Sequence, residues 1–164
     1  MIKLLVFDVD GCLTDGSIIY GSNQDEYKAF NVKDGLAIAS WSRLGLKSAI
    51  ITGRNSKVVE RRAKELNISH LYQGIKDKKT LLEKILKEEN LSWENVAAIG
   101  DDLNDIGMLK SVEWSFTPND GVRLIKDSVK TVLTASGGKG AVREMIDMII
   151  EEEGLEEEFL KLWQ

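Results

Sequence analysis

The sequence has few of the residues that mark several large protein classes. A single cysteine, Cys12, excludes an internal disulfide framework, because each disulfide needs two cysteines. Basic residues are in the minority, with 22 Lys and Arg against 27 Asp and Glu, and no basic stretch occurs. The resulting formal charge of −5 argues against nucleic acid, and against an anionic membrane surface, as a partner.

Long apolar runs are also absent. No segment approaches the roughly 20 apolar residues of a membrane-spanning helix, and the first residues carry no signal-peptide pattern. We therefore expect a soluble, cytoplasmic protein that does not associate with membranes. Its length predicts one domain, residues 1–164, with a single core.

Short apolar segments alternate with helical patterns along most of the chain. Each segment is bounded by turn residues, which is typical of buried strands, and apolar residues at helical spacing follow most of them. This order predicts an α/β fold, with one doubly wound, Rossmann-like parallel sheet and helices on both faces. The clearest predicted strands are residues 2–7, 47–51, 70–72 and 96–100.

Two regions depart from this alternation. Residues 17–30 contain two short apolar segments around the turn-prone Gly21-Ser22-Asn23-Gln24-Asp25, which predicts a β-hairpin. A hairpin directly after the first strand would form a flap over the end of the sheet. Residues 154–164 form an acidic C-terminal tail that ends in apolar and aromatic residues.

Polar residues follow the predicted strands at their carboxyl ends. Asp8 and Asp10 come after the first strand, Thr52 and Asp101 come after two others, and Lys78 begins the helix behind a fourth. Because the carboxyl ends of parallel strands meet at one edge of a sheet, we expect these side chains to form one site. Strand alternation further predicts that Asp8 and Asp10 point to the same side.

This set of residues fits the hydrolysis of a phosphate monoester. Clustered carboxylates repel a phosphate, so the site requires a hard cation such as Mg²⁺. Asp8 can then attack phosphorus to give an aspartyl-phosphate, and Asp10 can protonate the leaving alcohol and later deprotonate water. Thr52, Gly53 and Lys78 can hold the phosphoryl oxygens.

The same residues resemble the motifs of a known superfamily. Asp8-Val-Asp10-Gly, Thr52-Gly53, Lys78 and Gly100-Asp101-Asp102-x-x-Asp105 are similar, in this order, to the four motifs of the haloacid dehalogenase (HAD) superfamily. A closer resemblance covers nearly the whole chain and is to the 3-deoxy-D-manno-octulosonate 8-phosphate (KDO 8-P) phosphatases of lipopolysaccharide biosynthesis. It is carried by residues 8–16, 28–35, 51–54, 70–74 and 137–144.

The resemblance implies a role for each matching residue. Asp8 would be the nucleophile and a Mg²⁺ ligand, Asp10 the acid/base and a ligand through its main-chain carbonyl, and Asp101 the remaining protein ligand. Asp105 would orient these ligands, while the role of Asp102 stays open. The substrate-binding residues would be Asp10, Asn31, Val32, Lys33, Asp34, Gly35, Thr52, Gly53, Arg54, Arg62 and Lys78.

The arginines have a physical reason to bind a sugar acid. Such a substrate carries a carboxylate besides its phosphate, and a guanidinium can form two parallel hydrogen bonds with a carboxylate. For Arg62, a solvated position on a helix explains the residue equally well.

The intervals between the motifs hold only a hairpin and single helices, so no cap domain is expected. An uncapped site needs a lid from elsewhere. The resemblance implies a homotetramer in which flap hairpins pack together and a C-terminal segment reaches the next subunit's site.

Three other functions are compatible with parts of the pattern. A receiver-type signalling domain also uses an aspartate, a threonine and a lysine, but it places its nucleophile on a later strand and has no counterpart of Asp10. A non-catalytic assembly module would be expected to have lost Asp8, Asp10 or Lys78, and all three are present. A phosphatase of a related nine-carbon sugar acid 9-phosphate is the alternative within the enzyme class.

Overall fold

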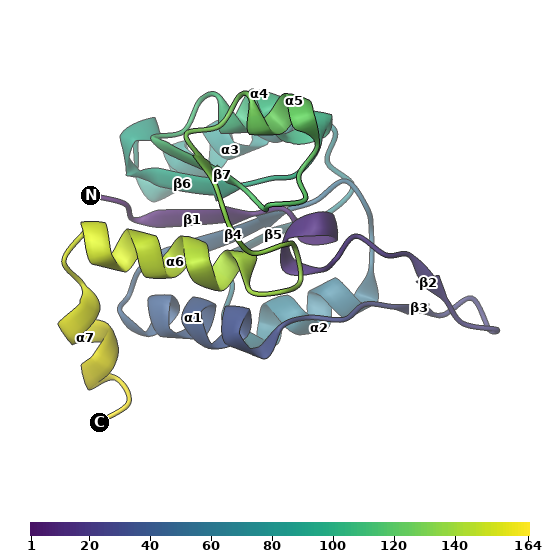
Figure 1. Ribbon diagram of the computed structural model, residues 1–164, viewed down its shortest axis with the longest axis horizontal. Helices are drawn as coiled ribbons and strands as arrows, with labels where there is room; N and C mark the ends of the chain where they lie inside the picture. Colours follow the sequence, from purple (N-terminus) through teal and green to yellow (C-terminus); the bar gives the residue numbers. More distant parts are fainter.

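Six short strands form the central sheet of the protein, whose computed structural model describes all 164 residues (Figure 1). The strands are β1 (Leu4–Phe7), β4 (Lys47–Ile51), β5 (His70–Tyr72), β6 (Val96–Ile99), β7 (Trp114–Thr117) and β8 (Thr131–Val132). All neighbouring pairs are parallel, in the spatial order β5-β4-β1-β6-β7-β8. The first strand thus lies between β4 and β6, and its carboxyl end is central in the sheet edge where ligands bind.

Helices cover both faces of this sheet. They are α1 (Val32–Arg43), α2 (Lys57–Glu65), α3 (Lys78–Glu89), α4 (Ile106–Leu109), α5 (Arg123–Lys126), α6 (Ala141–Glu152) and α7 (Glu156–Lys161), with the shorter helical turns η1 (Val9–Leu13), η2 (Trp93–Asn95) and η3 (Leu103–Asp105). Figure 1 shows α1, α2 and α6 on one face and α3, α4 and α5 on the other. The predicted doubly wound α/β fold without a cap domain is confirmed. None of these helices has the length and apolar character needed to cross a bilayer.

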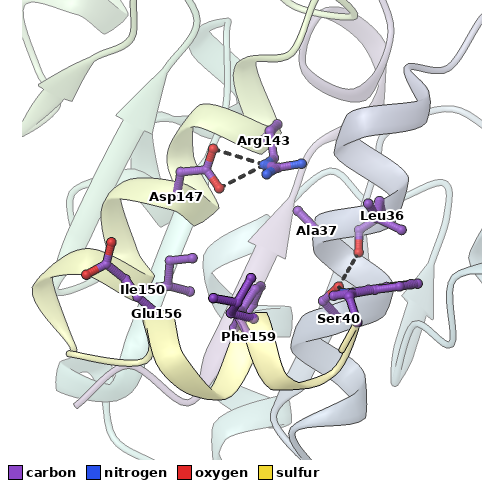
Figure 2. A pocket seen from close by; sticks show the side chains of 10 residues that line it. Leu36, Ala37, Ser40, Arg143, Asp147, Ile150, Glu156 and Phe159 are labelled. Atoms are coloured by element: carbon purple, nitrogen blue, oxygen red, sulfur yellow. Dashed lines mark hydrogen bonds and ion pairs between the residues drawn. The ribbon is translucent and has the colours of Figure 1, made fainter.

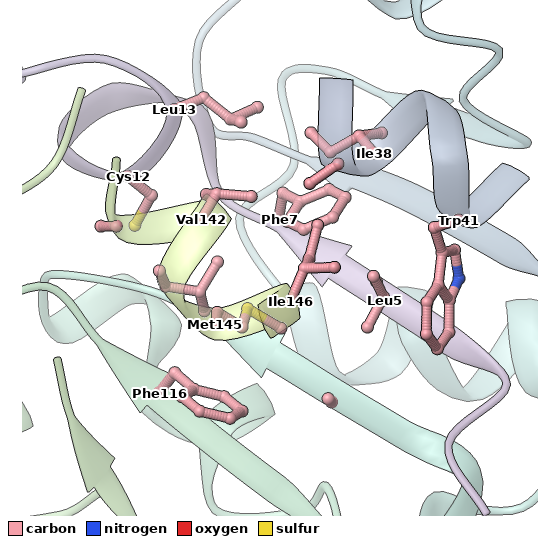
Figure 3. Close-up of a cluster of buried hydrophobic side chains, with 14 of the residues drawn as sticks. Leu5, Phe7, Cys12, Leu13, Ile38, Trp41, Phe116, Val142, Met145 and Ile146 are labelled. Carbon is pink, nitrogen blue, oxygen red and sulfur yellow. The ribbon is translucent and has the colours of Figure 1, made fainter. Parts of the chain in front are cut away.

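Strand β1 is buried on both faces. Leu5 and Phe7 belong to the core on the α1 and α6 side, whereas Leu4 and Val6 belong to the core on the α3 and α4 side. Figure 3 shows Phe7 beside Ile146 of α6. Burying a side chain of this size contributes about 1.5–3 kcal/mol relative to leaving it exposed. The strand that precedes Asp8 is therefore held firmly from both sides.

A β-hairpin extends from the body of the protein, as predicted for residues 17–30 (Figure 1). It consists of β2 (Ile19–Tyr20) and β3 (Glu26–Tyr27), which pair antiparallel. Its large side chains are not covered, since Tyr20 is 73% and Tyr27 55% exposed. The hairpin thus presents an apolar surface that the rest of this chain leaves open.

The C-terminal helix α7 lies against α1 and α6 of the same chain. The Trp163 indole Nε1 donates a hydrogen bond to Ser40 Oγ at 3.2 Å, and the Arg43 guanidinium stacks on the Trp163 ring at 4.8 Å from its centroid. Between the three helices lies a groove of about 350 Å³ (Figure 2). Its lining consists of Leu36, Ala37, Ser40, Arg143, Asp147, Ile150, Glu156, Phe159, Leu160 and Trp163. In this structure the predicted tail therefore covers its own subunit.

A buried carboxylate joins helices α1 and α6. Asp34, in the first turn of α1, is 1% exposed, and its Oδ1 accepts a hydrogen bond of 2.8 Å from the backbone N–H of Arg143. That N–H lies in the first turn of α6, where Gly140 at the N-cap position has no side chain to accept it. Asp34 thus replaces the missing cap from a neighbouring helix.

Burial raises the pKa of Asp34 from 3.8 to about 6, although the Arg143 N–H and the Arg62 and Arg143 charges favour the ionised form. Folding thus favours the protonated form of Asp34. The stabilisation that this protonation gives the folded state is fully present below about pH 4 and is lost as the pH rises through about 6. A shift of this size corresponds to about 3 kcal/mol at 1.36 kcal/mol per unit.

Asp34→Asn should therefore remove part of the pH dependence of stability. The neutral amide keeps an oxygen that can accept from Arg143, so the variant should gain about 3 kcal/mol relative to the wild-type chain between pH 4 and pH 7. Urea unfolding at both pH values measures this difference. Asp147→Asn, an exposed carboxylate beside the same Arg143, is the control and should leave the pH dependence unchanged. Parallel stability curves for wild type and Asp34→Asn would contradict the prediction.

Candidate active site

The chain turns sharply at the carboxyl end of β1. Asp8 has extended φ and ψ, is 5% exposed, and is followed by the turn η1, in which Asp10 and Gly11 have non-helical φ and ψ. Within this turn Gly11 has φ +90°, a conformation that glycine adopts without strain. The prediction that strand alternation places Asp8 and Asp10 on one side was therefore wrong in its reason, because Asp10 lies in the turn. Both carboxylates nevertheless line one cavity.

Lys78 forms the buried centre of the site. Its side chain is 1% exposed, and its Nζ donates to Asp8 Oδ1 at 2.8 Å and to Asp105 Oδ1 at 2.6 Å. The second oxygen of Asp105 accepts from the backbone N–H of Asp101 at 2.9 Å and of Asp102 at 3.3 Å. One lysine thus connects the loop after β1 to the loop after β6.

The cluster contains more negative than positive charge. Burial, and next the Asp105 charge, raise the pKa of Asp8 to about 6. Burial and the charges of Asp8 and Asp105 raise the pKa of Asp101 to about 8. The pKa of Lys78 lies above its ordinary value, because the attraction of Asp8 and Asp105 outweighs its burial. Three carboxylates share one ammonium group, so the site is short of positive charge.

A divalent cation fits this deficit. Carboxylate oxygens of Asp8 and Asp101 and the sulfur of Cys12 all lie within 4.8 Å of one another. Burial raises the pKa of the Cys12 thiol well above its ordinary value, and the neighbouring carboxylates raise it further, so the thiol stays protonated and is a poor ligand. The two aspartates supply the oxygen ligands that hard cations such as Mg²⁺ prefer.

An open cavity of about 270 Å³ lies above this cluster. Six residues that the sequence analysis assigned to the site are brought together in its lining, namely Asp8, Asp10, Thr52, Gly53, Arg54 and Asp101. Asp102, whose role was left open, is also there, where its side chain accepts from the backbone N–H of Leu103 at 2.7 Å. Gly16 and Asn104 line the cavity too and were not predicted, although both lie within the motif segments.

Charged residues of the hairpin reach the cavity edge. Lys28 Nζ lies 2.6 Å from Asp10 Oδ1 and 3.0 Å from Glu26 Oε1, and its side chain is 1% exposed. Burial alone would lower the pKa of Lys28, but its hydrogen bonds to Asp10 and Glu26 raise the pKa above the ordinary value. Both carboxylate oxygens of Glu26 lie 3.3 Å from Arg54 Nη2. Sequence reasoning assigned no role to Glu26 or Lys28, although Lys28 begins one of the segments that carry the family resemblance and Glu26 lies in the predicted hairpin.

Of the remaining predicted substrate-binding residues, Lys78 is buried against Asp8 and Asp105, and the others lie apart from the cavity lining. Asn31 Oδ1 caps α1 by accepting from the backbone N–H groups of Lys33 and Asp34 at 2.9 and 3.3 Å, and Val32 is 79% exposed. Arg62 lies over the Phe30 ring, 5.5 Å from its centroid. The side chain that an alanine would carry at Gly35 would meet Arg62 Nη2 at 2.3 Å. These residues form a second group on α1 and α2, and their contact with substrate stays a prediction.

The chain was compared with known proteins. Residues 23–113 match the model of the haloacid dehalogenase-like hydrolases. The chain is 42% identical, over 93% of its length and 81% of the relative's, to 3-deoxy-D-manno-octulosonate 8-phosphate phosphatase KdsC of Escherichia coli strain K12. The Salmonella typhi protein of the same name is equally similar, at 42% identity over the same shares of both chains.

Solved structures agree with these relatives. The phosphatase of this name from Moraxella catarrhalis, crystallised with magnesium, phosphate and KDO, superposes with a TM-score of 0.95 at 40% identity, covering 99% of this chain and 94% of that one. The cobalt-bound Haemophilus influenzae enzyme gives 0.89 at 37% identity, covering 93% and 90%. The chain belongs to the haloacid dehalogenase-like hydrolases. Within that class it belongs to the 3-deoxy-D-manno-octulosonate 8-phosphate phosphatase family.

Asp101→Asn should stabilise the protein in the absence of metal. The substitution removes one of three mutually repelling carboxylates, and each 1 kcal/mol gained should raise the melting temperature by about 2–4 °C in a chain of this size. Excess Mg²⁺ should raise the melting temperature of the wild-type protein, because a ligand that binds only the folded state stabilises it, and should do so much less for the variant. Thermal unfolding in EDTA and in MgCl₂ measures both effects.

Asp127→Asn, at the exposed end of α5, is the matched control and should change neither melting temperature. If Asp101→Asn lost stability in EDTA and kept the full response to Mg²⁺, the assignment of Asp101 as a ligand would be wrong.

Proposed function

We propose that this protein is a Mg²⁺-dependent phosphomonoesterase that hydrolyses 3-deoxy-D-manno-octulosonate 8-phosphate to the free sugar acid and phosphate. The observation that carries the proposal is the buried Lys78 between Asp8 and Asp105, beside an Asp8–Asp101 pair that needs a cation. The family, and the magnesium, phosphate and KDO bound to the Moraxella catarrhalis relative, support the choice of metal and substrate.

The first step is the attack of an Asp8 carboxylate oxygen on phosphorus. A bond forms between Asp8 and phosphorus while the bond from phosphorus to the sugar oxygen breaks, which gives an aspartyl-phosphate. Lys78, 2.8 Å from Asp8 Oδ1, keeps a positive charge beside the carboxylate throughout. A Mg²⁺ ion held by Asp8, Asp101 and the main-chain carbonyl of Asp10 would neutralise the incoming phosphate and so allow it to approach these carboxylates.

Asp10 handles the protons in both steps. It donates a proton to the departing sugar oxygen, which would otherwise leave as an unstable alkoxide. The resulting carboxylate then removes a proton from the water that attacks the aspartyl-phosphate, and this regenerates Asp8 and protonated Asp10 and releases phosphate. Its hydrogen bond to Lys28 holds the carboxyl at the cavity edge.

Residues after β4 hold the substrate. Thr52, which is 2% exposed, and the backbone N–H of Gly53 can donate to the phosphoryl oxygens. The Arg54 side chain lines the cavity and is 41% exposed, so its guanidinium can reach the sugar carboxylate. Asn31, Val32, Lys33, Asp34, Gly35 and Arg62 lie outside the cavity of their own chain. We assign Asn31, Val32, Lys33 and Arg62 to substrate contact within an assembly of several copies, and the buried Asp34 and Gly35 to holding this segment in place.

We extend the proposal to a cytoplasmic homotetramer that acts in lipopolysaccharide synthesis. The uncovered apolar side chains of the hairpin, among them Ile18 at 50% and Ile19 at 45% exposure, support contacts between copies. The cavity has no cap domain of its own, and neighbouring hairpins would limit its access to water. Sedimentation as a single chain at micromolar concentration would contradict this extension.

Asp10→Asn should impair turnover in proportion to the basicity of the leaving group. On a sugar phosphate, where the oxygen must be protonated, kcat should fall by about 10²–10⁴-fold, which is the usual contribution of general acid–base catalysis. On nitrophenyl phosphate, whose leaving group departs as a stable anion, the loss should be much smaller. Steady-state kinetics on both substrates measure the difference, with Asp8→Asn as the control that abolishes both reactions. Equal losses on the two substrates would remove Asp10 from the acid role.

Phosphate release from a panel of substrates tests the proposed specificity. With Mg²⁺ present, kcat/KM should be highest for the eight-carbon sugar acid phosphate, lower for a nine-carbon sugar acid 9-phosphate and lowest for hexose phosphates, which lack a carboxylate for Arg54. Arg54→Met should reduce this preference and leave the nitrophenyl phosphate rate nearly unchanged. A preference for hexose phosphates would overturn the specificity and leave the chemistry of Asp8 in place.

A further inference from the structure

The loop between β8 and α6 lies directly on the turn that carries the catalytic residues. Gly138 donates its backbone N–H to the carbonyl of Cys12 at 3.1 Å, and Gly137 donates to the Asp120 carboxylate at 3.0 Å. We propose that Gly137 and Gly138 are positioning residues that set the distance between the η1 turn and Asp101, and thereby the affinity for Mg²⁺ and the rate of turnover. The inference rests on the proposed function, because it concerns the same metal site.

The two backbones approach more closely than any side chain allows. A Cβ atom at Gly137 would lie 1.9 Å from the carbonyl oxygen of Gly11 and 2.5 Å from its carbon. A Cβ atom at Gly138 would lie 2.5 Å from the backbone nitrogen of Asp15 and 2.7 Å from the carbonyl carbon of Thr14. These atoms belong to the main chain, so they cannot rotate away as the end of a side chain can. Any addition to this loop therefore displaces the turn or the loop.

Asp101 lies on the other side of the same turn. A Cβ atom at Gly11 would lie 1.9 Å from Asp101 Oδ2, so Gly11 is enclosed between the glycine loop and a predicted metal ligand. The peptide bond before Gly11 contains the Asp10 carbonyl that we assign to the metal. A shift of the turn therefore changes the spacing between two of the three assigned ligands.

The loop has little freedom to move back. Helix α6 follows it directly, and Val142 and Met145 of that helix pack in the core with Cys12 and Leu13 of the turn (Figure 3). A larger residue in the loop would therefore displace the η1 turn. Because a displacement of about 1 Å can cost about 100-fold in rate, a small shift is sufficient to affect turnover.

Gly138→Ala tests the proposal against Gly45→Ala. Both glycines have positive φ, +71° and +78°, so both variants carry a similar backbone strain of about 1–2 kcal/mol. Only Gly138 has close neighbours, since nothing lies within 4 Å of a Cβ at Gly45, in the turn between α1 and β4. The comparison therefore isolates the contact with the η1 turn.

We expect Gly138→Ala to weaken Mg²⁺ binding by about tenfold or more, which equals about 1.4 kcal/mol. Calorimetric titration with MgCl₂ measures this without substrate. At saturating Mg²⁺, kcat for nitrophenyl phosphate should fall by about tenfold or more, while KM changes by less than about threefold, because the phosphate-holding groups after β4 are not displaced. Gly45→Ala should lose less thermal stability than Gly138→Ala, because it adds backbone strain without a clash, and it should keep wild-type metal affinity and kinetics.

Asp120→Ala is a second variant that adds no bulk. The Asp120 side chain is exposed, so its removal leaves the core intact and frees only the Gly137 N–H. It should weaken Mg²⁺ binding by about threefold, a value that corresponds to the loss of one hydrogen bond of about 0.6 kcal/mol. Asp127→Ala is its matched control and should bind Mg²⁺ like the wild-type protein.

The outcomes separate this inference from the proposed function. Wild-type Mg²⁺ affinity and kcat in both Gly138→Ala and Asp120→Ala would overturn the positioning role while leaving the phosphatase assignment intact. If Gly138→Ala does not fold, wild-type affinity in Asp120→Ala alone would overturn it. A wild-type protein that neither binds Mg²⁺ nor cleaves nitrophenyl phosphate would overturn the proposed function, and this inference with it.

Discussion

The repulsion among Asp8, Asp101 and Asp105 is the constraint on which the rest of the site depends. Burial strengthens this repulsion, because a carboxylate in a poorly solvated environment interacts strongly with its neighbours and lacks water to stabilise its charge. Lys78 offsets part of it by bonding two of the three carboxylates. Burial raises the pKa of Asp101 to about 8, and the negative charges of Asp8 and Asp105 add to the shift. A divalent cation would supply the missing positive charge. The site could then accept a negatively charged phosphate.

Close backbone packing holds these charges together. A fully buried strand fixes the position of Asp8. Gly11 within the η1 turn allows the turn to lie against Asp101, and Gly137 and Gly138 allow the loop before α6 to lie against the turn. The carboxylates therefore stay within ligand distance of one another although they repel. In energetic terms, burial of the apolar strand β1 and the helices around it offsets the cost of concentrating like charges at its end.

The hairpin links this site to the surface of the protein. Lys28 and Glu26 contact Asp10 and Arg54, whereas Tyr27, between them in sequence, and Tyr20, which pairs with Glu26, are uncovered. Any contact with these tyrosines would therefore involve the neighbours of Glu26 and Lys28, which reach the cavity edge. This connection gives a physical reason for an uncapped phosphatase to function as an assembly.

The sequence by itself determined the order of strands and helices and the identity of the residues at the strand ends, because periodicity and short motifs are local properties of the chain. It thus predicted the doubly wound sheet and six of the residues that line the cavity, from Asp8 to Asp101. Only the tertiary structure decided that the turn after Asp8 places Asp10 in the same cavity, that Lys28 contacts Asp10, and that the Asn31–Gly35 segment and Arg62 lie apart from the cavity. These features depend on distances between segments far apart in the chain, and such distances are set by how closely backbones pack and by which charges burial brings together.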